Sequence, residues 1–154
     1  KVSNDTRRSE RVNQARIENR LEVDAYLAQL KYALEHDCKL SFQEDRDVDK
    51  RRDIHYTNRF TIADLFPDED PVEVLKRELK KLRPEHYLRT VKDSRFPKRS
   101  EMREFGMVYN GTSEVYIKIR VELLNKVYSG GHTTFVMSFH YAMKPFCMED
   151  FPHR

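Results

Sequence analysis

The residues best suited to catalysis lie in two stretches in which apolar and polar side chains alternate with a period of two. In residues 114–120 every second side chain is a β-branched aliphatic one, and residues 133–141 alternate in a similar way. Such alternation is typical of a strand with one buried and one working face. The working faces would present Tyr116, Lys118, Ser138 and His140. A phenol, an ammonium and an imidazole together suit a metal-free phosphodiesterase, although they could simply form the wet face of a sheet.

A glycine-containing segment between the two stretches predicts how they pair. Ser129–His132 (SGGH) supplies the positive φ angles that a chain reversal needs, so we expect an antiparallel pair. Strict alternation would divide the side chains of the second stretch into two sets. One set contains Phe135, Met137, Phe139 and Tyr141, and the other contains Thr134, Val136, Ser138 and His140.

A second signal is the segment Lys76–Arg103, which we call the basic belt. It contains eleven lysines and arginines against four acids, whereas the whole chain carries only +3. Such a concentration of positive charge is typical of polyanion binding, although a solvated helix face followed by a loop would look the same. The candidate RNA-binding residues are Lys92, Arg95, Lys98, Arg99 and Arg103.

The composition narrows the class of protein. A chain of 154 residues suits one domain with a real core. Its two cysteines lack disulfide or metal-ligand spacing, which favours a reducing, cytoplasmic location and no metal site. No apolar run approaches the ~20 residues that cross a membrane, and no signal peptide is recognisable. Without a glycine-rich phosphate loop or a G-x-S-x-G motif, we expect no organic cofactor.

Four segments are expected to position these groups. They are a disordered N-terminus (1–8), a helical extension with a charged connection (9–53), a core (54–146) and a tail (147–154). In the core we predict a short strand at 54–60, a helical turn at 62–66, a helix from Pro71 to about Leu82, and strands at 85–92, 102–109, 114–120 and 133–141. The expected fold is therefore α+β, with an antiparallel sheet of about four to six strands packed on N-terminal helices.

The N-terminal helix, expected over Ser9–Asp37, carries two apolar stripes. One stripe contains Ile17, Leu21, Ala25 and Ala28, and the other contains Val23, Leu27, Leu30 and Leu34. Since a helix needs one stripe to pack on a sheet, we expect the other, with Val23 and Leu30, to meet a second chain, either a partner protein or a copy of this chain in a homodimer. Alternatively, both stripes belong to the core.

This succession of elements resembles the MqsR-type messenger-RNA interferase toxins, a branch of the RelE-like microbial ribonuclease fold. The residues that carry the resemblance are 54–66, 82–87 (LRPEHY), 115–119 (VYIKI) and 136–140 (VMSFH), within a likeness from about Ala25 to Tyr141. Tyr116 and Lys118 match the family's tyrosine and lysine, and Arg89 lies close to its basic residue. His140 replaces a lysine, and the N-terminal extension and the charged segment 40–53 depart from the family pattern.

The resemblance implies a toxin that cleaves messenger RNA and is neutralised by an antitoxin, which would be the partner protein of the N-terminal helix. In metal-independent cleavage the ribose 2′-OH attacks its own phosphate, so the protein must accept one proton, donate another and stabilise charge on phosphorus. We expect His140 to transfer a proton, while Lys118 and Arg89 hold the phosphate. Tyr116 would position the ribose or stack on a base. Alternatively, His140 is a structural histidine bonded to a neighbour.

Two other classes of function remain open from the sequence. The protein could be a non-catalytic module that binds nucleic acid through the basic belt. It could also be an interaction domain that docks through its N-terminal helix. A requirement for His140 distinguishes an enzyme from a binding module, and salt-sensitive affinity distinguishes a nucleic-acid-binding module from a docking domain.

Overall fold

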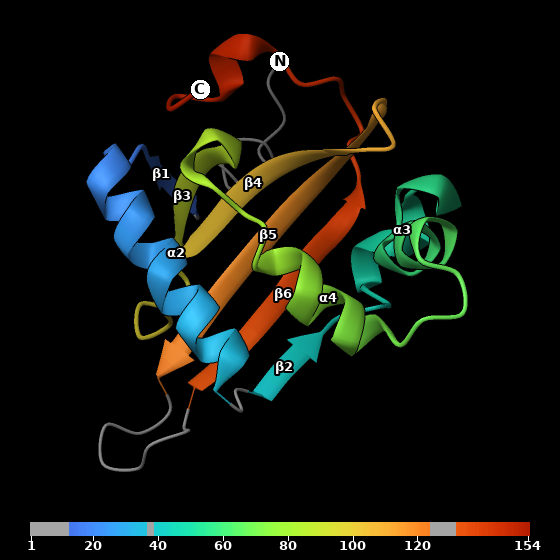
Figure 1. Cartoon of the computed structure of the whole chain (residues 1–154), viewed down its shortest axis with the longest axis horizontal. Helices are drawn as coiled ribbons and strands as arrows, with labels where there is room; N and C mark the ends of the chain where they lie inside the picture. The colour runs from blue at the N-terminus through green and yellow to red at the C-terminus, as the bar shows by residue number, and fades with distance from the viewer. Residues whose placement is uncertain (1–12, 37–38, 124–131) are drawn as a thin grey trace.

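The computed structural model describes residues 13–36, 39–123 and 132–154. The predicted disordered segment 1–8 and most of the predicted reversal at 129–132 lie outside the described residues. Within those residues the strands are β1 (Asn13–Arg16), β2 (Lys39–Phe42), β3 (Tyr87–Asp93), β4 (Met102–Tyr109), β5 (Ser113–Leu123) and β6 (His132–Tyr141). They form one sheet in the order β1-β3-β4-β5-β6-β2, which Figure 1 shows.

The sheet confirms the expected α+β class and corrects its details. Neighbouring strands are antiparallel except β2, which runs parallel to β6 and makes the sheet mixed. β1 lies within the predicted helix Ser9–Asp37, and β2 begins the segment 40–53 that was expected to be an exposed connection. Helix α2 (Arg20–Glu35) starts late because the Asn19 side-chain oxygen accepts a hydrogen bond from the Glu22 amide at 2.9 Å.

Two further helices follow β2, and they are α3 (Asn58–Leu65) and α4 (Pro71–Leu79). The predicted strand at 54–60 is wrong, since this segment forms a 3-10 turn, η2 (Ile54–Tyr56), and the start of α3. The Asp53 side chain accepts from the His55 amide and the Thr57 hydroxyl accepts from the Phe60 amide, so each turn is capped. The helix predicted from Pro71 is confirmed, with Asp70 as its cap.

Helices α2 and α4 cross one face of the sheet, which we call the helix-covered face (Figure 1). Val115, Ile117 and Ile119 of β5 are fully buried there, together with Val23 and Leu30 of α2. The prediction that Val23 and Leu30 form an outer stripe is therefore wrong, because the helical repeat turns both toward the sheet. The other stripe is the exposed one, and Leu21 keeps 79% of its surface accessible.

The pairing of β5 with β6 confirms one prediction from the sequence and corrects another. Tyr116 lies opposite His140 and Lys118 lies opposite Ser138, as expected. The next pair is Ile119 with Val136, so Met137 is an extra residue that forms a β-bulge.

The bulge breaks the strict alternation that the sequence predicted along β6. Val136 and Thr134 turn to the helix-covered face with Phe139 and are fully buried. Phe135 turns to the opposite face, where the Arg120 guanidinium lies 4.3 Å from its ring centroid.

A buried asparagine at the start of α3 stabilises this bulge. The Asn58 amide nitrogen donates to Met137 O at 3.0 Å and to Gln43 O at 2.7 Å. Its side-chain oxygen accepts from the Phe139 amide at 3.0 Å. One side chain thus provides partners for two backbone groups of β6 and for one in the residue that follows β2.

Candidate active site

A pocket of about 890 Å³ lies on the sheet face opposite α2 and α4, which we call the pocket face. Four predicted catalytic residues line it, and they are Arg89, Tyr116, Lys118 and His140. They come from β3, β5 and β6. The alternation of β5 explains this position, because Tyr116 and Lys118 point away from the buried aliphatic face.

The register aligns a row of charged and polar side chains across four strands. Arg89 of β3 pairs with Glu104 of β4, Glu104 pairs with Lys118, and Lys118 pairs with Ser138. The Arg89 Nε donates to Glu104 Oε1 at 3.1 Å. The second carboxylate oxygen, Oε2, is buried and has no hydrogen-bond partner among the described residues. At the far end of the row, Arg46 Nη1 donates to Ser138 Oγ at 3.0 Å.

His140 and Tyr116 form the next row of the sheet. Their ring centroids lie 5.4 Å apart, and His140 is only 4% exposed. The His140 Nδ1 lies 2.9 Å from Tyr141 O. Since a carbonyl oxygen only accepts, Nδ1 carries the proton in the neutral ring and Nε2 is the free acceptor. Burial lowers the pKa of His140, and the nearby Arg52 and Arg46 lower it further.

Burial also affects the pKa values of Lys118, Tyr116 and Arg89 in the pocket. It lowers the pKa of Lys118, and the Glu104 carboxylate offsets only part of that effect. Burial together with Glu104 raises the pKa of Tyr116, so the phenol stays protonated at neutral pH. Burial opposes the charge of Arg89, but the Glu104 carboxylate outweighs it and raises the pKa of the guanidinium. The pocket therefore combines a neutral imidazole with several cations.

Sequence reasoning missed five charged residues that line this pocket, and they are Arg46, Arg52, Glu104, Lys144 and Asp150. Arg46 and Arg52 belong to the charged segment that was expected to be an exposed connection. The segment folds because the Arg46 amide donates to Asp49 Oδ2 at 3.0 Å and starts a 3-10 turn, η1 (Asp47–Arg51). Glu104 had a usable signal, since it alternates with buried Phe105 in a predicted strand.

The predicted RNA-binding residues lie outside the described lining of the pocket. The Lys92 Nζ donates to Pro97 O and Arg99 O and so holds the β3–β4 loop together. Arg103 faces the helices, where its Nε donates to Glu18 Oε1 at 2.9 Å and its guanidinium covers the Tyr26 ring. Both residues therefore have structural partners.

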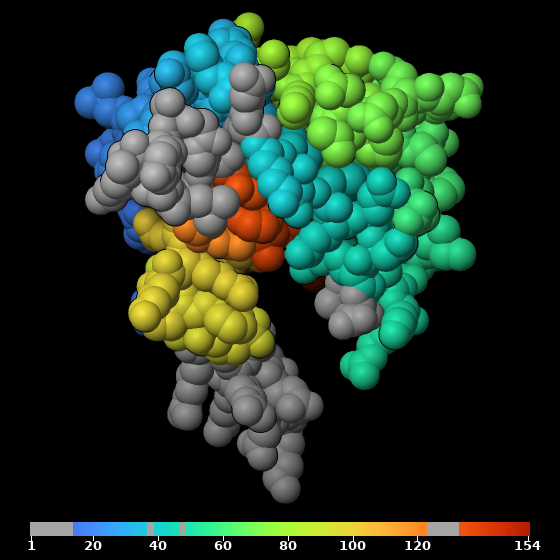
Figure 2. All heavy atoms as spheres, turned by 90° about the horizontal axis from the view of Figure 1, so that it is seen from below, coloured from blue at the N-terminus to red at the C-terminus, as the bar shows by residue number. Residues whose placement is uncertain are grey.

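Arg95, Lys98 and Arg99 lie on the exposed β3–β4 loop, which projects from the body of the molecule in Figure 2. The basic belt therefore does not form one surface. Its first part lies on α4, where Arg77 pairs with Glu69 and Glu78.

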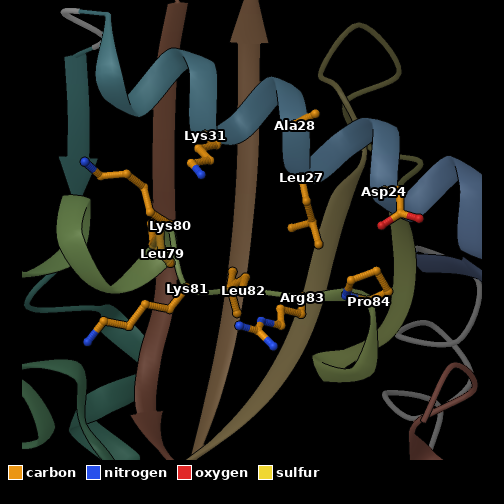
Figure 3. A pocket seen from close by; sticks show the side chains of 10 residues that line it. All are labelled: Asp24, Leu27, Ala28, Lys31, Leu79, Lys80, Lys81, Leu82, Arg83 and Pro84. Carbon is orange, nitrogen blue, oxygen red and sulfur yellow. The ribbon is translucent and has the colours of Figure 1, made fainter.

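A second hollow of about 400 Å³ lies on the helix-covered face, between α2 and the chain that follows α4 (Figure 3). Figure 3 shows Leu27 pointing from α2 into it, while Lys80 and Lys81 extend away. Lys81 donates to Glu78 at 2.9 Å. The lining contains no histidine, tyrosine or cysteine among the described residues. The described lining of this hollow therefore lacks the imidazole, phenol or thiol that proton transfer would use.

Comparison with known proteins found no family model, no curated protein and no solved structure that matches this chain. In the described part of the chain, no three histidine, cysteine or acidic residues are grouped as a metal site would require. The helices described here are too short or too polar to cross a membrane.

Proposed function

We propose that this protein is a toxin-type endoribonuclease that cleaves single-stranded RNA without a metal, by attack of the ribose 2′-OH on the adjacent phosphate. One observation carries the proposal. A buried imidazole with a free Nε2 lies in a pocket lined by Arg46, Arg52, Arg89 and Lys118. A neutral base beside clustered cations suits a phosphodiester, because the phosphate is anionic and its hydroxyl nucleophile must lose a proton.

In the proposed reaction His140 Nε2 accepts the proton of the 2′-OH. The 2′-oxygen then forms a bond to phosphorus, and the bond to the 5′-oxygen breaks. The products are a 2′,3′-cyclic phosphate and a 5′-hydroxyl. The lowered pKa of His140 keeps the imidazole neutral near pH 7 and ready to act as the base.

Lys118 donates the proton that the leaving 5′-oxygen needs. The lowered pKa of its ammonium makes that donation easier than for an ordinary lysine. Arg89 and Arg46 hold the phosphate oxygens and stabilise the added negative charge, and the guanidinium geometry suits a bidentate contact. Glu104 fixes Arg89 through their hydrogen bond of 3.1 Å. Tyr116, protonated at neutral pH, positions the ribose.

The resemblance to MqsR-type toxins supports a toxin role and an antitoxin partner. Tyr116 and Lys118, which match the family's tyrosine and lysine, line one pocket with Arg89 and with His140, which stands where the family has lysine. Growth arrest on expression of the wild-type chain, but not of His140→Ala, tests the toxin role in cells.

The enzymatic proposal is tested with RNA in excess chelator. We expect wild-type protein to leave 2′,3′-cyclic phosphate and 5′-hydroxyl ends, and His140→Ala to lower the rate by about 10²–10⁴-fold. His36→Ala is the matched control, because His36 is exposed and lies outside the pocket lining. Activity that disappears in chelator and returns with magnesium contradicts the mechanism.

A second candidate function is RNA binding without cleavage, and the β3–β4 loop favours it. The guanidinium groups of Arg95 and Arg99 lie 5.7 Å and 3.8 Å from the centroid of the exposed Phe96 ring. An aromatic ring flanked by arginines is a common platform for a base and its phosphate.

Changing Arg95, Lys98 and Arg99 together to glutamine tests this loop. We expect affinity to fall equally for all sequences and the salt slope to fall by about two to three. The control changes Lys31, Lys80 and Arg83, which surround the hollow of Figure 3. An equal loss in the control assigns the effect to net charge and removes the loop from the binding surface.

A further inference from the structure

The pocket has a second set of lining residues that the proposed chemistry does not use. Besides charged and polar residues, which include Lys144 and Asp150, it is lined by apolar side chains. These are Ile17, Leu88, Ala142, Met143, Pro145 and Phe146. Most of them come from the chain after β6, which the sequence analysis placed at the end of the core.

This C-terminal segment is fixed against the sheet at its start. The Ala142 amide donates to Glu114 O at 2.9 Å, and the Phe146 amide donates to Glu114 Oε2 at 3.1 Å. The Phe146 and Phe151 rings pack edge to face with centroids 5.4 Å apart. Both rings lie over Gly106, where an added Cβ would come within 2.8 Å of Phe146 and 3.0 Å of Phe151. A glycine in β4 is therefore what lets the segment approach the pocket.

The same segment is fixed again at its far end. Figure 1 shows it crossing the end of the sheet toward the start of α2. There the His153 Nε2 lies 2.8 Å from Glu18 O, and Arg20 Nη1 donates to His153 O at 3.1 Å. The His153 ring also stacks on Tyr87 with centroids 5.6 Å apart. Because both ends of the segment are held, Met143 is kept at the pocket that it lines.

Two of the apolar side chains at this wall are unusually accessible. Met143 is 56% exposed and Ile17 is 58% exposed, although both line the pocket. Apolar surface beside fixed cations fits a ligand that is anionic at one end and flat and apolar at the other. A free phosphate would contact only the cations. A nucleotide could contact the cations with its phosphate and the apolar side chains with its base. The pocket volume of 890 Å³ is within the range for a ligand of this size.

We propose that Ile17 and Met143 form a nucleobase-binding wall, so that the pocket recognises a nucleotide by its phosphate and its base together. This inference rests on the proposed function for the placement of a phosphate on the cationic row. It adds the substrate unit, which is one base with its own phosphate. It also makes the C-terminal segment part of the binding site.

The test measures binding without cleavage, using nucleoside 3′-monophosphates and base-free ribose 3-phosphate. We expect wild-type protein to bind at least one nucleotide about tenfold more tightly than the sugar phosphate. The double variant Ile17→Ala, Met143→Ala should reduce that preference to less than about twofold and leave the affinity for the sugar phosphate unchanged. Met148→Ala is the control, since Met148 is an exposed methionine of the same segment outside the pocket lining.

Three results would overturn the proposal of a nucleobase-binding wall. They are equal affinity of wild-type protein for both ligands, a preference that survives the double variant, and an equal loss in Met148→Ala. Tight binding of decyl phosphate that falls in the double variant as nucleotide binding does would also overturn it, in favour of an acyl chain. If base-dependent binding is found but RNA stays intact, the wall is supported and the proposed cleavage is wrong.

Discussion

The two faces of the sheet use the same strands for opposite purposes. On the helix-covered face, Val115, Ile117 and Ile119 of β5 are completely buried under α2 and α4. On the pocket face, Tyr116 and Lys118 of the same strand remain partly exposed and line the cavity. Adjacent residues therefore contribute to different properties. One set stabilises the fold, and the other gives the pocket its chemistry.

The faces also differ in how they treat buried charge. On the helix-covered side, burial opposes the ionisation of Glu18, but Arg103 and Thr90 outweigh it and lower the carboxyl pKa. Arg77 and Lys81 likewise lower the pKa of Glu78 against the effect of burial. The pocket face instead leaves Glu104 Oε2 without a hydrogen-bond partner among the described residues. The Tyr26 hydroxyl of α2 is also buried without a partner in the described part of the chain, but it is neutral, so the contrast between the faces concerns the buried carboxylates.

Substitutions at two neighbouring residues of β5 are expected to show the largest difference between the two faces, one affecting stability and the other RNA cleavage. Ile117→Ala should lower the free energy of unfolding by about 2–5 kcal/mol, because it opens a cavity under the helices. Lys118→Ala should leave the fold stable and abolish RNA cleavage. Urea denaturation and cleavage assays on the two variants measure the contrast. A strongly destabilised Lys118→Ala would show that the two faces do not divide their tasks in this way.

The bulge connects the two faces, and Asn58 tests that connection. Asn58→Ala should cost about 2–3 kcal/mol, because it leaves buried backbone groups without partners. Cleavage per folded molecule should also fall, since the bulge sets the positions of Ser138 and His140. Asn58→Asp is the control, because it keeps the acceptor for the Phe139 amide and loses the two donated bonds. Full activity in a folded Asn58→Ala protein would separate the bulge from the site.

The pH dependence of stability sharpens the comparison further. Burial lowers the pKa of His140 in the folded protein, so its contribution to stability is present above the unfolded pKa of about 6.5 and is lost as pH falls toward the folded pKa. His86, whose pKa burial also lowers, acts in the same direction. Each histidine can add at most about 1.4 kcal/mol per pH unit to the slope.

Urea denaturation between pH 5 and pH 8 measures these slopes. His140→Gln and His86→Gln should each remove part of the loss of stability that occurs below about pH 6.5. A slope that stays the same in His140→Gln would show that this imidazole is not kept neutral by the fold.

Lys118 gives the smallest expected effect on stability and the opposite sign. Its lowered pKa means that the folded protein disfavours the ammonium charge. Lys118→Met should therefore raise the free energy of unfolding by about 0.5–1 kcal/mol while cleavage is lost. Lys144→Met is a useful comparison, because Lys144 lines the same pocket but is exposed. A destabilised Lys118→Met would indicate that its attraction to Glu104 exceeds the cost of burial.

Local patterns predicted the centre of the sheet well and its edges poorly. The alternation of β5 fixed which side Tyr116 and Lys118 occupy, because side-chain direction depends only on the strand itself. β1 and β2 have four residues each, too few for a periodic signal. Asn58, almost eighty residues away, donates a hydrogen bond to Met137 O at the bulge. A contact between such distant residues cannot be predicted from a local sequence pattern.

The pocket was predictable in part for the same reason. Its strand residues follow from alternation and pairing, whereas Arg46 and Met143 reach it from irregular segments. The position of such segments is set by single contacts, such as that of Phe146 with Gly106, rather than by a repeating pattern. A glycine in a strand gave one hint, because it often marks a close approach by another part of the chain.

The bulge also determines how β6 can change in length. Since Met137 is the extra residue, deleting it would join Val136 directly to Ser138 and restore regular alternation, with Val136 toward the helices and Ser138 toward the pocket. Deleting Phe139 instead would turn His140 toward the helix-covered face. Position 137 is therefore a place where an insertion or deletion can be absorbed without exchanging the two faces of the strand.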